Sequence, residues 1–152
     1  MLKYAIAGAL AFGLVGHASS AEVAPTDVKF VDDIEVMESL TGKPGDAAAG
    51  KKWYANRKLG NCLACHVTSD LEELPFHGEV GPEMDGVADR YEEPQLRAIL
   101  VNSKKIFGDE TLMPGFYSLE VGARTHKKFK GKTILEAQQV EDIIAYLKTM
   151  KE

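Results

Sequence analysis

Residues 62–66 read Cys62-Leu63-Ala64-Cys65-His66, and this stretch decides how the rest of the chain must fold. Two thiols two residues apart, followed at once by a histidine, form the attachment pattern of a c-type haem. One short turn lets both sulfurs reach the two vinyl groups on one edge of a porphyrin. The adjacent imidazole then lies under the iron as an axial ligand. The sequence therefore predicts one covalent haem c, held by Cys62 and Cys65, with His66 on the iron.

A Cys-x-x-Cys pair alone is also compatible with a redox dithiol or with half of a zinc site. The chain has two cysteines in all, so a zinc site would need distant histidines. The histidine directly after the second cysteine is what a haem needs, and the export signal described next also favours haem. Because both sulfurs are expected in thioethers, no disulfide is expected.

The first 21 residues have the composition of a secretory signal. Lys3 supplies a positive start, residues 4–15 are mostly apolar, and Ser19 and Ala21 are small residues at the positions that a signal peptidase reads. We expect cleavage after Ala21 and a periplasmic protein with no membrane span after cleavage. An uncleaved anchor is the alternative, but the apolar run is short for a span.

Cleavage leaves residues 22–152, enough for one domain with one hydrophobic core. We expect a signal peptide at residues 1–21, an N-terminal extension at 22–45 and a haem domain at 46–152. Losing Lys3 takes the formal charge from −5 to −6. This acidity disfavours nucleic acid as a partner. The extension is acidic with interleaved apolar residues, so either it packs on its own domain or it lies on a partner.

The haem domain shows helical signals throughout. Asp46 suits an N-cap for a helix over residues 47–58. Pro94 suits the first turn of a second helix, which is expected to end near Asn102 and to be followed by a loop over residues 104–114. The clearest helix carries apolar residues at i, i+3, i+4 and i+7, namely Val140, Ile143, Ile144 and Leu147.

Gly50 permits a close crossing by another helix, and the apolar face of the last helix is its expected partner. We find neither a period-two strand pattern nor an internal repeat. The fold class is therefore all-α, with small helices wrapped around one covalent haem. The rigid loop at residues 81–87 has carbonyl groups that suit the free Nδ1–H of His66, the bond that orients a ligating imidazole.

The opposite axial ligand has six candidates: Met37, Met84, Met113, Met150, His77 and His126. Met113 is favoured because it lies in a loop, is followed by Pro114 and Gly115, and has Phe107, Phe116 and Tyr117 nearby in sequence to shield the iron. His126 or an open position are the alternatives. Histidine and methionine together raise the reduction potential and suit electron transfer, and they leave no site for oxygen or peroxide.

A basic segment follows this loop. Residues 123–132 hold Arg124, Lys127, Lys128, Lys130 and Lys132 and no acidic residue. A solvated loop is one interpretation, and a docking surface for an acidic partner is the other.

Five stretches, in order, match a known family: residues 39–46 (SLTGKPGD), 60–66 (GNCLACH), 81–91 (GPEMDGVADRY), 113–117 (MPGFY) and 137–147 (AQQVEDIIAYL). With them the chain resembles the SoxX family, the monohaem cytochrome subunits of the SoxAX complexes of bacterial thiosulfate oxidation. The haem motif and the last helix are shared by many small cytochromes c, whereas the stretches around Gly81 and Met113 are more particular to this family. One departure is Glu136, where a small N-cap residue is expected.

The resemblance implies a class I cytochrome c fold, with Cys62 and Cys65 holding the haem and His66 and Met113 as axial ligands. It implies a heterodimer with SoxA, which carries its own haem and a cysteine ligand. Together they would act as an L-cysteine S-thiosulfotransferase that joins thiosulfate oxidatively to a cysteine of the carrier SoxYZ. The catalytic centre would lie in SoxA, so this chain would contribute no catalytic residue. It would accept the electrons and pass them to a small cytochrome c.

Three functions remain distinguishable. An electron-transfer subunit predicts a constitutive partner and an apolar patch near the haem edge. A freely diffusing shuttle predicts a monomer that docks through the basic segment in a salt-sensitive way. A haem enzyme or gas sensor requires an open sixth position on the iron.

Overall fold

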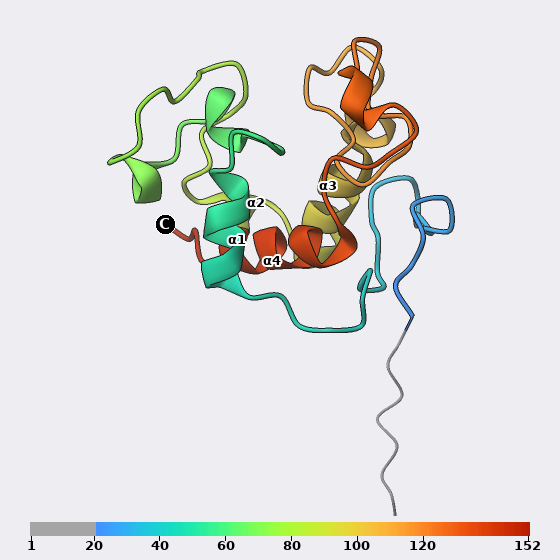
Figure 1. Ribbon diagram of the computed structural model, residues 1–152. Coiled ribbons are helices and arrows are strands. Elements are labelled where there is room, and N and C mark those ends of the chain that lie inside the picture. Colours follow the sequence, from blue (N-terminus) through green and yellow to red (C-terminus); the bar gives the residue numbers. More distant parts are fainter. Residues whose placement is uncertain (1–20) are drawn as a thin grey trace, which may run out of the picture.

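The computed structural model describes residues 21–152, so the signal peptide expected at residues 1–21 lies, apart from Ala21, outside the described residues. The described chain is helical and contains no strand beyond a single bridge between Val31 and Glu35, which confirms the all-α prediction. Its elements are α1 (Ala47–Tyr54), η1 (Cys62–Ala64), η2 (Ser69–Leu71), α2 (Val87–Arg90), α3 (Glu93–Phe107), η3 (Lys127–Phe129) and α4 (Ala137–Leu147) (Figure 1). None of the helices in this part is long and apolar enough to cross a bilayer.

The crossing of α1 and α4 is the base of the fold, and it depends on Gly50. The carboxylate of Asp46 caps α1 by accepting from the N–H groups of Ala48 and Ala49, at 2.8 and 3.1 Å. One turn later, a Cβ on Gly50 would lie 1.9 Å from the carbonyl oxygen of Asp142 in α4. Only glycine permits this approach, so the predicted contact between the Gly50 face and the last helix is confirmed.

The predicted helix ends were less accurate. α1 ends at Tyr54 rather than near Lys58, because the side chain of Asn56 accepts from the N–H of Lys58 at 2.9 Å and offers the backbone a turn in place of a further helical bond. α3 does not end near Asn102. It is interrupted there, with φ −152° and ψ 85°, and then continues to Phe107, so the start of the predicted loop at residues 104–114 is helical.

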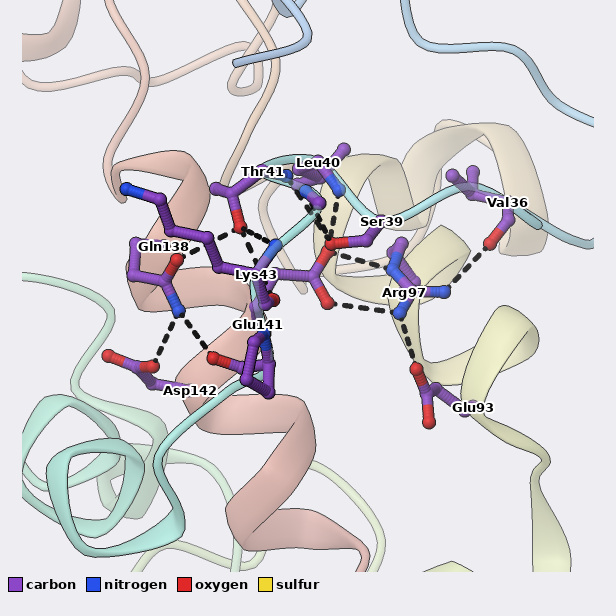
Figure 2. Close-up of polar contacts among 12 residues, drawn as sticks. Val36, Ser39, Leu40, Thr41, Lys43, Glu93, Arg97, Gln138, Glu141 and Asp142 are labelled. Atoms are coloured by element: carbon purple, nitrogen blue, oxygen red, sulfur yellow. Dashed lines mark hydrogen bonds and ion pairs between the residues drawn. The ribbon is translucent and has the colours of Figure 1, made fainter. Parts of the chain in front are cut away.

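The N-terminal extension packs on its own domain, as one of the two interpretations of residues 22–45 expects. Val36 and Leu40 are buried, with 2% and 1% of their surface exposed. The N–H of Val36 donates to the carbonyl of Pro94 at 3.0 Å, and the N–H of Leu40 donates to Oε1 of Glu141 in α4 at 2.8 Å. Both bonds join the extension to helices far along the chain, and Figure 2 shows the one between Leu40 and Glu141.

Arg97 is the centre of this junction. Its guanidinium donates to both carboxylate oxygens of Glu141, at 2.9 and 3.0 Å, to the carbonyl of Val36 at 3.0 Å and to Glu93 at 2.6 Å (Figure 2). Glu93 also pairs with Lys148. A buried ion pair is tolerated when hydrogen bonds satisfy its remaining donors and acceptors, as they do here. α3, α4 and the extension are therefore fixed together.

Candidate haem site

A cavity of ≈ 380 Å³ opens between two walls of the molecule. One wall is the segment with η1 and the loop after it, and the other is α3 with the segment that follows, while α4 lies at the base (Figure 1). The cavity is mostly apolar. Its lining residues are Tyr54, Gly60, Asn61, Cys62, Cys65, His66, Val80, Gly81, Pro82, Met84, Val87, Arg90, Tyr91, Leu96, Ile99, Leu100, Phe107, Thr111, Leu112, Met113, Pro114, Phe116, Ile143 and Leu147. All four residues predicted to hold a haem are among them.

The tight turn at η1 brings both cysteines to the cavity. The N–H groups of Cys65 and His66 both donate to the carbonyl of Cys62, at 3.1 and 3.0 Å, so the motif is folded on itself. Burial raises the pKa of the Cys62 thiol to about 12, with the neighbouring Cys65 adding to the rise. The motif is therefore a compact turn whose first sulfur is buried at the cavity.

His66 is held in one tautomer and one orientation. Its Nδ1 lies 2.7 Å from the carbonyl oxygen of Pro82, and because that oxygen can only accept, Nδ1 carries the proton. In the neutral ring Nε2 then carries the free lone pair, which is the form that binds a metal. Gly81 lies against the ring, since a Cβ there would be 2.3 Å from His66 Cε1. The predicted role of this loop in orienting the imidazole is confirmed.

Met113 lies in the lining of the same cavity, in a loop tied to α3. The hydroxyl of Ser103 donates to the carbonyl of Met113 at 2.6 Å. Of the three aromatic residues expected around it, Phe107 and Phe116 line the cavity. Tyr117 does not. Its hydroxyl donates to the carbonyl of Val23 at 2.7 Å, so this ring connects the loop to the start of the extension.

The other candidate ligands are placed less favourably. Met84 lines the cavity, but it is two residues from Pro82 and therefore belongs to the His66 side. His77 has both ring nitrogens bonded, accepting from the N–H of Thr68 at 3.3 Å and donating to the carbonyl of Leu71 at 3.1 Å. His126 is exposed and accepts from the N–H of Lys128.

The remaining methionines, Met37 and Met150, do not line the cavity. Met37 is 59% exposed in the extension, and Met150 is buried in the hydrophobic core beyond α4. Across residues 21–152, no three His, Cys, Asp or Glu side chains gather in a way that could hold a metal ion. The sulfur and imidazole donors that line the cavity are therefore two thiols, one imidazole and the thioethers of Met84 and Met113, set in an apolar wall. This set fits a covalently bound c-type haem.

Comparison with known proteins agrees with this geometry. A family model described as cytochrome c matches residues 47–151, and no curated protein matches the chain. A chain of the crystal structure of SoxXA from P. pantotrophus is similar, with a TM-score of 0.78 and 41% sequence identity. The match covers 87% of this chain and 100% of that chain. Residues 46–152 are only about 70% of the sequence, so the shared structure includes much of the extension. The chain therefore belongs to the cytochrome c family and is a SoxX-like member of it, with the all-α fold of class I cytochromes c.

Proposed function

We propose that this chain is the haem-carrying electron-transfer subunit of a SoxXA-type complex in the periplasm. It accepts electrons when thiosulfate is joined to a cysteine of a SoxYZ-type carrier, and it passes them to a small cytochrome c. The observation that carries this proposal is the similarity at 41% identity to the whole of one chain of a SoxXA structure. The partner is then a SoxA-like haem subunit, which holds the catalytic centre of the thiosulfotransferase.

Four residues hold the cofactor in this proposal. Cys62 and Cys65 would form the thioether bonds, and His66 and Met113 would hold the iron. One haem is bound per chain, because the sequence contains a single Cys-x-x-Cys-His motif. When bound, the haem supplies one reversible electron change at its iron. The bond from His66 Nδ1 to Pro82 keeps the other ring nitrogen available as a ligand.

The surroundings of the site suit electron transfer rather than substrate binding. A thioether ligand raises the reduction potential, and two protein ligands exclude oxygen and peroxide from the iron. Joining thiosulfate to a thiol forms one S–S bond and releases one proton and two electrons. This chain therefore passes the electrons on singly, in two successive transfers.

An apolar rim surrounds the opening of the cavity and supports a constitutive partner. We define this rim as Val80, Phe107 and Leu112, which line the cavity yet remain 63%, 49% and 79% exposed. The haem would cover the inner side of these residues, and their outer atoms would border the haem edge, where apolar surface commonly marks an interface with another protein. The rim is where the SoxA-like subunit docks in this proposal, because contact there brings its haem close to the cavity.

A freely diffusing shuttle is the second candidate, and the basic segment at residues 123–132 favours it. Most of this segment is exposed, and Lys128 ties it to the turn before the haem motif by donating to the carbonyl of Lys58 at 2.7 Å. Gly60, two residues after Lys58, lines the cavity, so the basic segment lies near the site. Such a surface docks transiently to acidic partners, and its binding weakens as salt is added.

The proposed function is tested by mixing the purified ferric haem protein with a SoxA-like subunit, reduced carrier and thiosulfate. Thioether ligation of ferric haem gives a weak near-infrared band, and its loss reports reduction of this chain specifically. We expect the band to disappear only when all components are present. Persistence of the band in the full mixture, or equal loss with thiosulfate alone, would overturn the proposal.

A further inference from the structure

The interruption of α3 at Asn102 lies against the loop that carries Met113. In a continuous helix each carbonyl accepts from the N–H four residues later. Here the carbonyls of Leu100 and Val101, the two residues before the interruption, accept from the N–H groups of Phe116 and Tyr117 at 3.1 and 3.2 Å. The loop is thus hydrogen bonded to the helix at the point where the helix is irregular.

Ser103, the residue after the interruption, adds a third bond. Its hydroxyl donates to the carbonyl of Met113 at 2.6 Å, and Ser103 is completely buried. The bond joins the helix to the very residue whose thioether reaches the cavity. Fixing this carbonyl restricts the backbone dihedrals of Met113 and so the positions that its sulfur can occupy.

The other side of the loop is fixed as well. The carbonyl of Phe116 accepts from the N–H groups of both Ile134 and Leu135, at 2.9 and 3.0 Å. Gly115 lies close to the interruption, because a Cβ there would be 3.2 Å from Asn102 Oδ1 and 3.1 Å from Ser118 Cβ. The loop is therefore held between α3 and the segment before α4, with little room to shift.

We propose that Ser103 is a positioning residue for Met113, and that its hydrogen bond at the irregular turn of α3 keeps the thioether in place on ferric iron. This inference rests on Met113 being the axial ligand. Ferric iron binds a thioether weakly, so retaining the ligand in the oxidised state depends on the loop that presents it. Without the Ser103 hydroxyl, the carbonyl of Met113 loses its donor inside the protein, and the loop leaves the iron more readily.

The test replaces Ser103 by alanine in the full-length haem protein. Ferric protein is titrated with imidazole, which competes for the methionine position, and binding is followed by the shift of the main haem absorption band. We expect S103A to bind imidazole about tenfold more tightly than the parent protein, the effect of losing one buried hydrogen bond worth about 1.4 kcal/mol. Its near-infrared band should weaken in parallel.

Tyr146→Phe is the matched control, since it removes a hydroxyl that donates to Asp70 at 2.7 Å and does not line the cavity. It should lower stability without changing imidazole affinity. Gly115→Ala provides a second route if S103A fails to mature, because its methyl group would press on Ser118 Cβ and Asn102 Oδ1, and either these atoms or the loop must shift. Unchanged imidazole affinity in the variant that matures would overturn the inference.

The experiments distinguish failure of the Met113 ligand assignment from failure of the positioning role of Ser103. If the parent protein lacks the near-infrared band, or if Met113→Ala retains it, then Met113 is not the ligand and the proposed site is wrong. If the band depends on Met113 but neither S103A nor G115A changes imidazole affinity, then the ligand assignment holds and only the positioning role of Ser103 is wrong.

Discussion

At the scale of single residues, the imidazole of His66 is controlled by two neighbours in one loop. Pro82 supplies a carbonyl that fixes the proton on Nδ1, and Gly81 supplies the space for the ring. The N–H of Gly81 also donates to the carbonyl of Cys65 at 2.7 Å, so the loop is tied directly to the haem motif. This loop therefore sets both the tautomer and the tilt of the imidazole.

Gly81→Ala tests that control. Its Cβ would lie 2.3 Å from the imidazole, so either the ring or the loop must move. We expect a loss of about 1–3 kcal/mol in unfolding free energy, typical of overpacking, together with a changed haem spectrum. Urea unfolding and absorption spectra of the haem protein provide the measurement. Pro82→Ala keeps the accepting carbonyl and should leave the spectrum unchanged; an altered spectrum there but not in G81A would contradict this account.

Met113→Ala tests the second axial ligand against Met84, the other methionine in the cavity lining. We expect M113A to lose the near-infrared band of ferric protein and to acquire a lower reduction potential, because thioether ligation raises the potential. Met84→Leu, which is close in volume, should retain both properties. The opposite pattern, with the band lost in M84L alone, would reassign the ligand.

At the scale of elements, the sequence predicted caps, turns and helix faces better than it predicted where helices end and which distant charged residues meet. The cap at Asp46 and the carbonyl partner of His66 follow from residues near in sequence, and the close approach at Gly50 follows from a glycine on one helix and the apolar face of the last helix. All three predictions are confirmed. The interruption of α3 at Asn102 was predicted only as a helix end. A sequence signal that a helix stops does not reveal that tertiary bonds will restart it one residue later.

The packing of the extension had no local signal. Arg97 and Glu141 are 44 residues apart and are both buried, whereas charged residues are usually exposed, so nothing near either residue in the sequence indicates that they pair. Only the fold shows that Arg97 and Glu141 form an ion pair and that the carboxylate of Glu141 also accepts a hydrogen bond from the N–H of Leu40. The short helix α2 was also missed, because four residues are too few to show a periodic pattern.

Arg97→Met tests the junction between the extension, α3 and α4. The substitution leaves the carboxylate of Glu141 buried without its cation, which typically costs about 3–5 kcal/mol. Lys105→Met is the control, because its ion pair with Asp33 also reaches the extension but is exposed and should contribute less than about 1 kcal/mol. Urea unfolding compares the two, and equal losses would show that burial of the pair is not what matters.

Acid should weaken the same junction through Glu93. The hydrogen bond from Lys148, followed by that from Arg97, holds the pKa of the Glu93 carboxyl below its ordinary value of 4.5. A carboxyl with a lowered folded-state pKa stabilises the protein above the ordinary pKa, and this contribution is lost as the pH falls below it. We expect Glu93→Gln to flatten the decline of unfolding free energy from about pH 4.5 downward. Glu120→Gln changes an exposed position, so the unfolding free energy of this variant should decline with falling pH as that of the parent protein does.

At the scale of the whole molecule, the chain combines a closed side and an open side. The extension, α1, α3 and α4 form a continuous support beneath the cavity, whereas Val80, Phe107 and Leu112 stand exposed at its opening. The support explains how the proposed haem ligands are held, and the open rim is what a second subunit would cover. The resemblance found in the sequence predicted the partner, but the rim itself emerged only from the fold.

The most direct test of the central claim is gel filtration of the native haem protein from thiosulfate-grown cells, followed by haem staining of the peak. We predict that a second haem polypeptide co-elutes with this chain. Leu112→Asp, on the rim, should abolish co-elution, whereas Leu119→Asp, at an exposed leucine away from the cavity lining, should not. Elution of the parent chain alone at its monomer size, even at low salt, would contradict the subunit function and favour a diffusible electron shuttle.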